Sequence, residues 1–291
     1  MPRARRVRAL GAALLAVLAA GCAHNLTQAR SPCRGLPGGW CDFTRAMAIE
    51  SWEYAQLSNN TYADEEAFPV LPAGIVERFN SGNDDYGYAY AVYDRMEGAR
   101  LVEVILAYRG TEASLDDWIK GNFSGAHNPR GLATYDQLRR QLDEAGHPEV
   151  PITVTGHSLG GGIATYVSLR EDNARAYVFN TSPRFDLPEE PRMNRRIAVT
   201  ERGEALRALR QLAEIPPVDI FVVNCRPGGN LFRDHSVRRL AECLTWIAGY
   251  ADRRARASVE ANGIEPPPIE QKYRLGSGYA EPVAEAKDRG D

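Results

Sequence analysis

The spacing of apolar positions changes several times along the chain and predicts helices and strands in turn. The expected helices cover residues 43–58, 135–145, 161–171, 204–213 and 235–257. The expected strands cover residues 75–79, 86–93, 101–108, 151–155, 176–180, 196–200 and 220–224. Because helices and strands alternate beyond residue 101, the pattern predicts an α/β fold whose largely parallel sheet is covered by helices on both faces. Functional side chains of such a fold gather at the carboxyl ends of the strands.

A serine flanked by glycines lies between one expected strand and the next helix. The segment Gly156-His157-Ser158-Leu159-Gly160 follows the strand directly and precedes the small residues that start the helix. A turn this sharp brings two chain segments so close that a Cβ at the flanking positions would clash, which explains the glycines. The arrangement is typical of the nucleophile elbow of α/β-hydrolases. Ser158 is therefore the candidate nucleophile, and a glycine-rich turn without chemistry is the alternative.

The N-terminus has the pattern of an export signal. Four arginines precede an apolar stretch over residues 10–20 that is too short to span a bilayer comfortably, and small residues then lead to Cys22. The run Leu18-Ala19-Ala20-Gly21-Cys22 resembles a bacterial lipobox, in which the cysteine is diacylated and becomes the new N-terminus. The alternatives are an ordinary secretory signal and twin-arginine export from Arg5-Arg6. With Ala23 after the cysteine, the resemblance implies a lipoprotein of the bacterial outer membrane.

Removal of that leader makes the net charge of the chain more negative, which disfavours anionic binding partners. The full chain of 291 residues has a net charge of −3, and residues 1–21 hold four arginines and no acid, so the remainder carries −7. An acidic protein is a poor binder of nucleic acid or of anionic lipid held by charge alone. The two acyl chains on Cys22 would instead hold it to the membrane.

The composition, 44% hydrophobic and 25% charged, fits one sizeable domain with accessory segments. We expect a signal peptide over 1–21, a linker over 22–42, an α/β-hydrolase domain over 43–257 and a flexible tail over 258–291, for which a docking peptide is the alternative. Four further cysteines suggest two local disulfides in an oxidising compartment. Three pairings exist and buried free thiols are the alternative, but neighbouring positions favour Cys33 with Cys41 and Cys225 with Cys243. Their spacing does not indicate a metal site.

A serine hydroxyl needs a base, and the chain has only five histidines. His24 adjoins the anchor, His157 should point away from its neighbour Ser158, and His127 and His147 precede the nucleophile. The chain order serine, acid, histidine leaves His235, on the loop after the last expected strand. A plain helix start at Asp234-His235-Ser236 is compatible with that role.

The acid that orients this histidine should follow the preceding strand. Glu204 is the preferred candidate, and Glu201, Asp219 and Asp186 remain open. An oxyanion hole also requires fixed N–H donors. The amide of Leu159 follows the nucleophile, and Thr111 ends a glycine-supported turn after the strand over 101–108, where it could give its amide and hydroxyl.

Together these segments resemble the class 3 lipase family of fungal lipase-like α/β-hydrolases. The resemblance covers roughly residues 43–250 and rests on Tyr108-Arg109-Gly110-Thr111, Asp117-Trp118 and Gly156-His157-Ser158-Leu159-Gly160-Gly161. It implies ester hydrolysis on acyl lipids, with Ser158 as nucleophile and Thr111 in the oxyanion hole. The chain departs from the family at Glu204-Ala205-Leu206, where an aspartate followed by proline is usual.

The expected activity is thus a serine hydrolase of carboxylic esters such as acylglycerols, phospholipids or smaller esters, acting through an acyl-enzyme without a cofactor. A thioesterase or amidase would use the same groups. The rival from another class is a non-catalytic envelope lipoprotein that keeps the hydrolase shell as a binding module.

Overall fold

The computed structural model describes residues 33–62, 67–82, 87–110, 127–210, 213, 216–227 and 233–273. Its strands are β1 (Ile75–Asn80), β2 (Tyr90–Glu97), β3 (Arg100–Tyr108), β4 (Ile152–His157), β5 (Arg175–Phe179), β6 (Arg196–Glu201) and β7 (Asp219–Val223). Its α-helices are α2 (Asp42–Asn59), α4 (Asn128–Glu144), α5 (Leu159–Ser168), α6 (Arg207–Arg210), α7 (Val237–Ala248), α8 (Arg253–Ala261) and α9 (Pro268–Tyr273). Two 3₁₀ turns, η1 (Pro37–Gly39) and η3 (Arg233–His235), complete the described elements.

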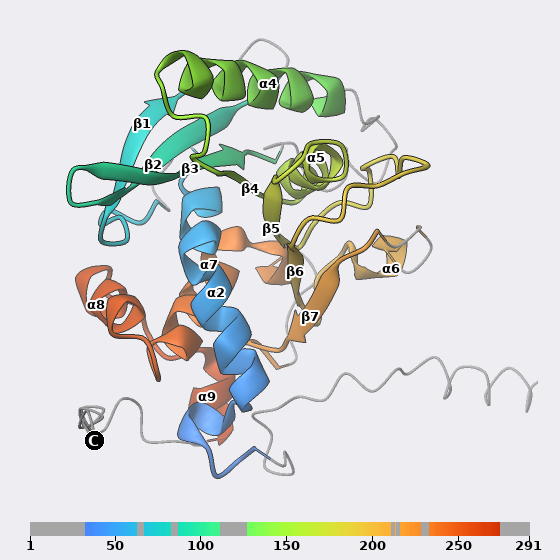
Figure 1. Ribbon diagram of the computed structural model, residues 1–291. Coiled ribbons are helices and arrows are strands. Elements are labelled where there is room, and N and C mark those ends of the chain that lie inside the picture. Colours follow the sequence, from blue (N-terminus) through green and yellow to red (C-terminus); the bar gives the residue numbers. More distant parts are fainter. Residues whose placement is uncertain are drawn as a thin grey trace, which may run out of the picture.

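The seven strands form one sheet in which spatial order follows chain order, β1-β2-β3-β4-β5-β6-β7. The first three strands are an antiparallel meander, and every pair from β3 to β7 is parallel. Figure 1 shows the twist that separates β1 at one edge from β7 at the other. The carboxyl ends of the parallel strands consequently meet along one rim of the sheet, where the turn after β4 lies.

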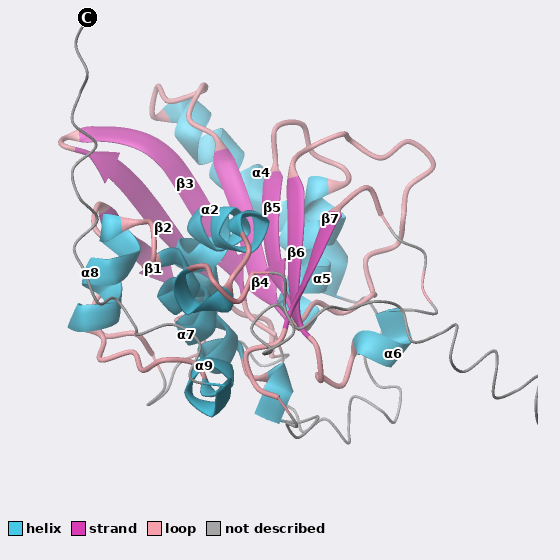
Figure 2. Ribbon diagram, turned by 90° about the horizontal axis from the view of Figure 1, so that it is seen from below, coloured by secondary structure: helices cyan, strands magenta, loops and turns pink. Residues whose placement is uncertain are grey.

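Helices cover both faces of this sheet, as Figure 2 shows from below. On one face α2 and α7 pack over an apolar cluster that includes Trp52, Tyr93 and Phe179, all almost fully buried. On the other face α4 and α5 pack over a second cluster around Leu106, Val154 and Ile163. Parallel strands need both faces dry, which is why β4, β5 and the part of β3 from Glu103 onward consist almost wholly of buried side chains. The predicted α/β fold, with a largely parallel sheet covered by helices on both faces, is confirmed.

Several predicted element boundaries change in the structure. β2 begins at Tyr90 rather than at 86, and the helix expected over 204–213 is reduced to the single turn of α6. The long helix expected over 235–257 is two helices, α7 and α8, because Asp252 caps the second by accepting the amide of Arg254. Helix α4 begins seven residues before the expected start, at Asn128, with Pro129 in its first turn, and Gly131 lets the helix approach Ile163 of α5 closely.

Packed structure also extends beyond both expected domain limits, which corrects the predicted linker and tail. Glu270 of α9 is 6% exposed, although the prediction placed it in a flexible tail. Its carboxylate accepts hydrogen bonds from the indole of Trp40, from Trp246 Nε1 at 3.0 Å and from Tyr250 Oη at 2.7 Å. Because Trp40 lies in the expected linker, one buried carboxylate joins the start of the domain to its end. Residues 274–291 lie outside the described residues.

We expect Glu270→Ala to lower the free energy of unfolding by about 3–5 kcal/mol, since three buried donors would lose their acceptor at once. Urea denaturation followed by tryptophan fluorescence measures this change. The matched control is Glu260→Ala on the exposed side of α8, which should change stability by less than about 0.5 kcal/mol. Equal stability of the two variants would contradict the joining role of Glu270.

Two disulfides fasten the chain near the same regions. Cys33 is bonded to Cys41 before α2, and Cys225, two residues after β7, is bonded to Cys243 in α7. These are the two local pairs that the sequence favoured. The second bridge closes an 18-residue separation that contains His235, and a loop of that size is expected to contribute about 3 kcal/mol.

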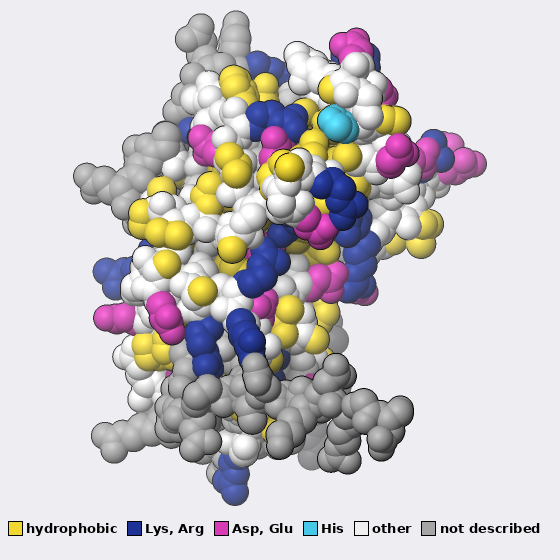
Figure 3. Space-filling view, turned by 60° about the vertical axis from the view of Figure 1, so that its left-hand side comes forward, with side chains coloured by type: hydrophobic (Ala, Val, Ile, Leu, Met, Phe, Trp, Pro, Cys, Tyr) yellow, Lys and Arg dark blue, Asp and Glu magenta, His cyan; other side chains and the backbone are white. Residues whose placement is uncertain are grey.

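The outer surface carries the mixture of groups that solvent-exposed faces normally have. On the face in Figure 3, hydrophobic side chains lie singly or in small groups among basic and acidic ones. Within the described part of the chain, no helix combines the length and apolar composition that a bilayer crossing requires.

Candidate active site

The turn between β4 and α5 has the strained geometry expected of an elbow. Ser158 has φ 55° and ψ −123°, an unusual backbone conformation for a residue with a Cβ. A Cβ on Gly156 would lie 2.4 Å from the carbonyl carbon of Gly160, and one on Gly160 would lie 2.1 Å from the carbonyl oxygen of Tyr108. The flanking glycines are therefore required by close backbone contact, and that contact holds the serine at the rim of the sheet.

Three side chains from separate parts of the chain form a line of hydrogen bonds at this rim. The distance from Ser158 Oγ to His235 Nε2 is 3.0 Å, and the distance from His235 Nδ1 to Glu204 Oε2 is 2.9 Å. With a carboxylate accepting from Nδ1–H, the neutral ring presents an unprotonated Nε2 to the serine hydroxyl. The arrangement can remove the proton of Ser158 and stabilise the resulting imidazolium.

Glu204 is the carboxylate that reaches the ring, and its side chain is fully buried. It also accepts the amide of Leu206 at 2.9 Å and pairs with the guanidinium of Arg210. These donors fix the orientation of the Glu204 carboxylate. One of them, the amide of Leu206, lies in the segment Glu204-Ala205-Leu206, where the sequence differs from the pattern that it otherwise resembles. Burial lowers the pKa of Arg210, whereas the neighbouring Glu204 acts in the opposite direction.

The other acids considered from the sequence point elsewhere. Glu201 accepts the backbone amide of Cys225 with both oxygens at 3.1 Å. Asp219 is exposed and pairs with Arg195, while Asp186 lies exposed on the loop after β5. The sequence could not separate these candidate acids, because each of them lies near an end of a predicted strand.

The buried carboxyl group of Glu201 has a strongly shifted pKa. Burial raises its pKa to about 8, and the nearby Asp234 and Glu204 act in the same direction. The folded protein thus keeps a proton that the unfolded chain releases between about pH 4.5 and pH 8. Stability is consequently lost as the pH rises through that window.

We expect Glu201→Gln to remove this loss, because the amide stays neutral at every pH. The difference in unfolding free energy between Glu201→Gln and the unmodified protein should move in favour of the variant by about 1.4 kcal/mol per pH unit at most between pH 5 and pH 8. Urea titrations at pH 5, 6, 7 and 8 measure it. A difference that does not change with pH would refute the buried proton.

His157 has a part in the site that the sequence did not reveal. Its Nε2–H donates to the backbone carbonyl of His235 at 2.6 Å, and its Nδ1 accepts the hydroxyl of Tyr62 at 2.9 Å. Tyr62 Oη in turn accepts the amide of Gly110 at 3.1 Å. Burial, followed by the charge of His235, holds the pKa of His157 well below its usual range. A neutral ring therefore links the end of β3 to the loop that carries His235.

Asn180, at the end of β5, supports the same loop from another side. Its Nδ2 donates to the carbonyl of Asp234 at 3.2 Å, and its Oδ1 accepts the amide of Glu201 at 2.9 Å. The residue is fully buried with φ 41°, a conformation that asparagine tolerates better than most residues. A strand-terminal asparagine after an apolar run was the one signal in the sequence that could have identified it.

Of the two candidate oxyanion donors, only Leu159 lies within the described residues. Leu159 is the first residue of α5, where a backbone N–H has no acceptor within the helix. Arg109 and Gly110 follow β3 as expected, and a Cβ on Gly110 would lie 2.4 Å from Tyr62 Oη. Thr111, Asp117, Trp118 and Cys22 lie outside the described residues.

Comparison with known proteins gives one family match. Residues 53–183, less than half of the chain, match the family model described as phospholipase-like, the Tle-like phospholipase domain. The matched segment runs from α2 to the loop after β5 and includes Ser158. No curated protein matches the sequence significantly.

Solved structures with a similar arrangement include fungal lipases. The Rhizomucor miehei lipase–propeptide complex has 14% identity over 57% of this chain and a TM-score of 0.38, and this chain covers 63% of its length, less than two thirds. Lip2 lipase from Yarrowia lipolytica has 16% identity over 59% of this chain and 76% of its own, with a TM-score of 0.38. A structure described as a fungal lipase has 13% identity over 82% and 96%, with a TM-score of 0.44.

Proposed function

We propose that this protein is a serine hydrolase that cleaves carboxylic esters of acyl lipids. The observation that carries the proposal is the hydrogen-bonded line from Ser158 through His235 to the buried Glu204, with the serine on a strained elbow. The match of residues 53–183 to a phospholipase-like family supports the choice of a lipid ester as substrate. The proposed roles are nucleophile for Ser158, general base for His235 and orienting acid for Glu204.

In the first half of the reaction His235 Nε2 takes the hydroxyl proton while Ser158 Oγ attacks the ester carbonyl carbon. The carbonyl electron pair moves to oxygen, and the N–H of Leu159, with Thr111 as the second donor, stabilises that charge. Collapse of the tetrahedral intermediate breaks the bond to the alkoxy oxygen, which receives the proton from His235. Water then repeats the sequence on the acyl-enzyme and releases the carboxylic acid and free Ser158.

His157 and Asn180 act as positioning residues in this proposal. Both bind backbone carbonyls of the loop that carries His235, so neither needs to contact the substrate. Their bonds restrict the imidazole to the orientation in which one nitrogen faces the serine and the other faces Glu204. Such restriction matters because displacement of a catalytic group by about 1 Å can cost about 100-fold in rate.

A fluorophosphonate probe tests the serine directly. We expect one covalent adduct per folded chain, located at Ser158 by peptide mass spectrometry. Chromogenic esters of short and long acyl chains and a phospholipid then define the substrate. A folded protein that neither labels nor hydrolyses any of them would favour the binding module without catalysis, and turnover of thioesters or amides alone would favour those variants of the chemistry.

We also propose that the protein is an exported lipoprotein, held by acyl chains on Cys22 and directed to the bacterial outer membrane. The lipobox-like run supports the lipid anchor, and an alanine instead of an aspartate at position 23 supports the outer membrane as its location. Labelling with radioactive palmitate in a bacterial host should mark the unmodified chain, and Cys22→Ala should abolish the label. An unlabelled, soluble parent chain would overturn the anchor.

A further inference from the structure

An apolar cavity lies beside the candidate active site, on the sheet face that carries α5. Its volume is about 250 Å³, and its walls come from β5, β6 and β7 and from the loop after β5. Val178 and Phe185 are buried in these walls. Ile220 of β7 is 52% exposed and Val222 is 39% exposed, although both line the cavity. The cavity thus leaves part of an apolar sheet face in contact with water.

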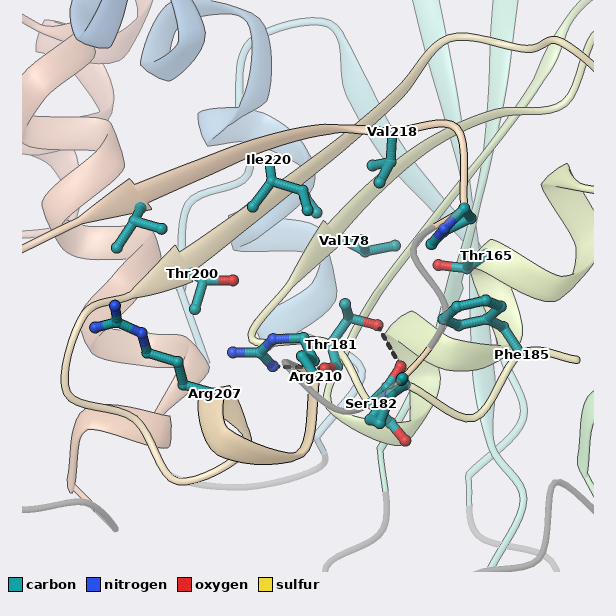
Figure 4. Close-up of a pocket in the computed structure, with 15 residues that line it drawn as sticks. Thr165, Val178, Thr181, Ser182, Phe185, Thr200, Arg207, Arg210, Val218 and Ile220 are labelled. Atoms are coloured by element: carbon teal, nitrogen blue, oxygen red, sulfur yellow. Dashed lines mark hydrogen bonds between the residues drawn. The ribbon is translucent and has the colours of Figure 1, made fainter. Parts of the chain in front are cut away.

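Two arginines give this cavity a charged end. Figure 4 shows Arg207 and Arg210 on the side of α6, across the cavity from Val218 and Ile220. Arg210 donates to the carbonyl of Thr181 at 2.6 Å and pairs with Glu204. Arg207 donates to the carbonyl of Arg202 at 3.1 Å. Among the ion pairs of the described residues, none involves Arg207, so its positive charge is available to an anion at this end.

The cavity is separate from the position where the ester bond would react. Ser158, His235 and Glu204 are not among the residues that line it. The loop after β5 separates the two: Thr181 and Ser182 line the cavity, and the amide of Ser182 donates to the carbonyl oxygen of Ser158 at 2.9 Å. A molecule in the cavity would therefore lie behind the elbow, in contact with Arg210, the partner of Glu204.

We propose that this cavity binds a fatty acid, with its alkyl chain against β5–β7 and its carboxylate on Arg207. The apolar walls match an unbranched chain, and the charged end matches a single anionic group, because guanidinium binds carboxylate through paired hydrogen bonds. Burial of Ile220 and Val222 by the chain removes apolar surface from water and favours binding. Binding does not require Ser158 to react, so this site is independent of the proposed hydrolysis.

Equilibrium dialysis of radiolabelled decanoate against the full mature chain carrying Ser158→Ala tests the proposal. We expect saturable binding of one decanoate per chain. Arg207→Gln should raise Kd at least about tenfold, since a charge-assisted bond is lost. Ile220→Asn should raise Kd about fivefold through lost apolar contact. The control Arg140→Gln on the exposed face of α4 should leave Kd unchanged, and thermal unfolding by circular dichroism verifies that each variant is folded.

Two further measurements decide the ligand chemistry and the location. Decanol should displace decanoate at least about tenfold less effectively than unlabelled decanoate does, because it lacks the anionic group. A decanoic acid with a photoreactive diazirine near its methyl end should label β6 or β7. Non-saturable binding, equal displacement by decanol, or wild-type affinity in folded Arg207→Gln and Ile220→Asn would overturn the proposal. Labelling confined to residues 156–160 would also overturn it, because the ligand would then occupy the reacting site.

Discussion

Ser158→Ala is expected to lower kcat for a carboxylic ester by about 10,000-fold while the protein remains folded. The hydroxyl forms the covalent acyl-enzyme in the proposed reaction, so its loss removes the nucleophile. Ser158 is only partly buried, and the alanine keeps the Cβ that the elbow already accommodates at φ 55°. Stability should consequently change little. Initial rates with a short chromogenic ester and a urea denaturation curve measure the two effects.

His235→Ala provides the companion measurement. Residues that act as one unit lose activity together, so the double variant with Ser158→Ala should be no slower than the slower single variant. A double variant that loses the product of the two single effects would show that serine and histidine act independently. Full activity in folded Ser158→Ala would remove the serine from the mechanism and favour another nucleophile.

The sequence predicted the elbow because the required residues are adjacent in the chain. A buried strand, a serine between glycines and a helix of small residues make one local pattern, and the clashes expected at Gly156 and Gly160 are those the structure contains. The histidine that contacts Ser158 could be identified by elimination, because the histidines are few and chain order separates them. Both arguments use information that lies within a short segment or in the order of segments.

The supporting residues could not be predicted, because their partners are distant in sequence. Tyr62 meets His157 across 95 residues, and Asn180 meets Asp234 across 54. Glu270 reaches Trp40 across 230 residues, and no periodicity in the polar C-terminal segment reveals that contact. From the sequence alone, a carboxylate in a proline-rich, weakly apolar stretch is expected to be solvent-exposed. Its burial follows only from the three-dimensional placement of Trp40, Trp246 and Tyr250 around it. The same reason left the choice of acid open among four carboxylates.

Glu204→Gln is expected to lower kcat/KM by about 100-fold to 10,000-fold. The amide has nearly the same shape as the carboxylate but no charge, so it cannot stabilise the imidazolium that forms when His235 takes the serine proton. It would also lose the ion pair with Arg210, which leaves that guanidinium with the carbonyl of Thr181 as its remaining acceptor among the described residues. Initial rates measured across pH 6–9 report the loss.

Glu201→Gln is the matched control, since Glu201 lies on the same segment, is equally buried and bonds to the amide of Cys225 rather than to His235. Its activity should stay within about threefold of the unmodified protein. If Glu201→Gln instead abolished turnover while Glu204→Gln retained it, the orienting acid would be Glu201 and not Glu204. If both variants retained full activity in the folded state, the line from Ser158 through His235 would work without a carboxylate, and the proposed division of roles would fail.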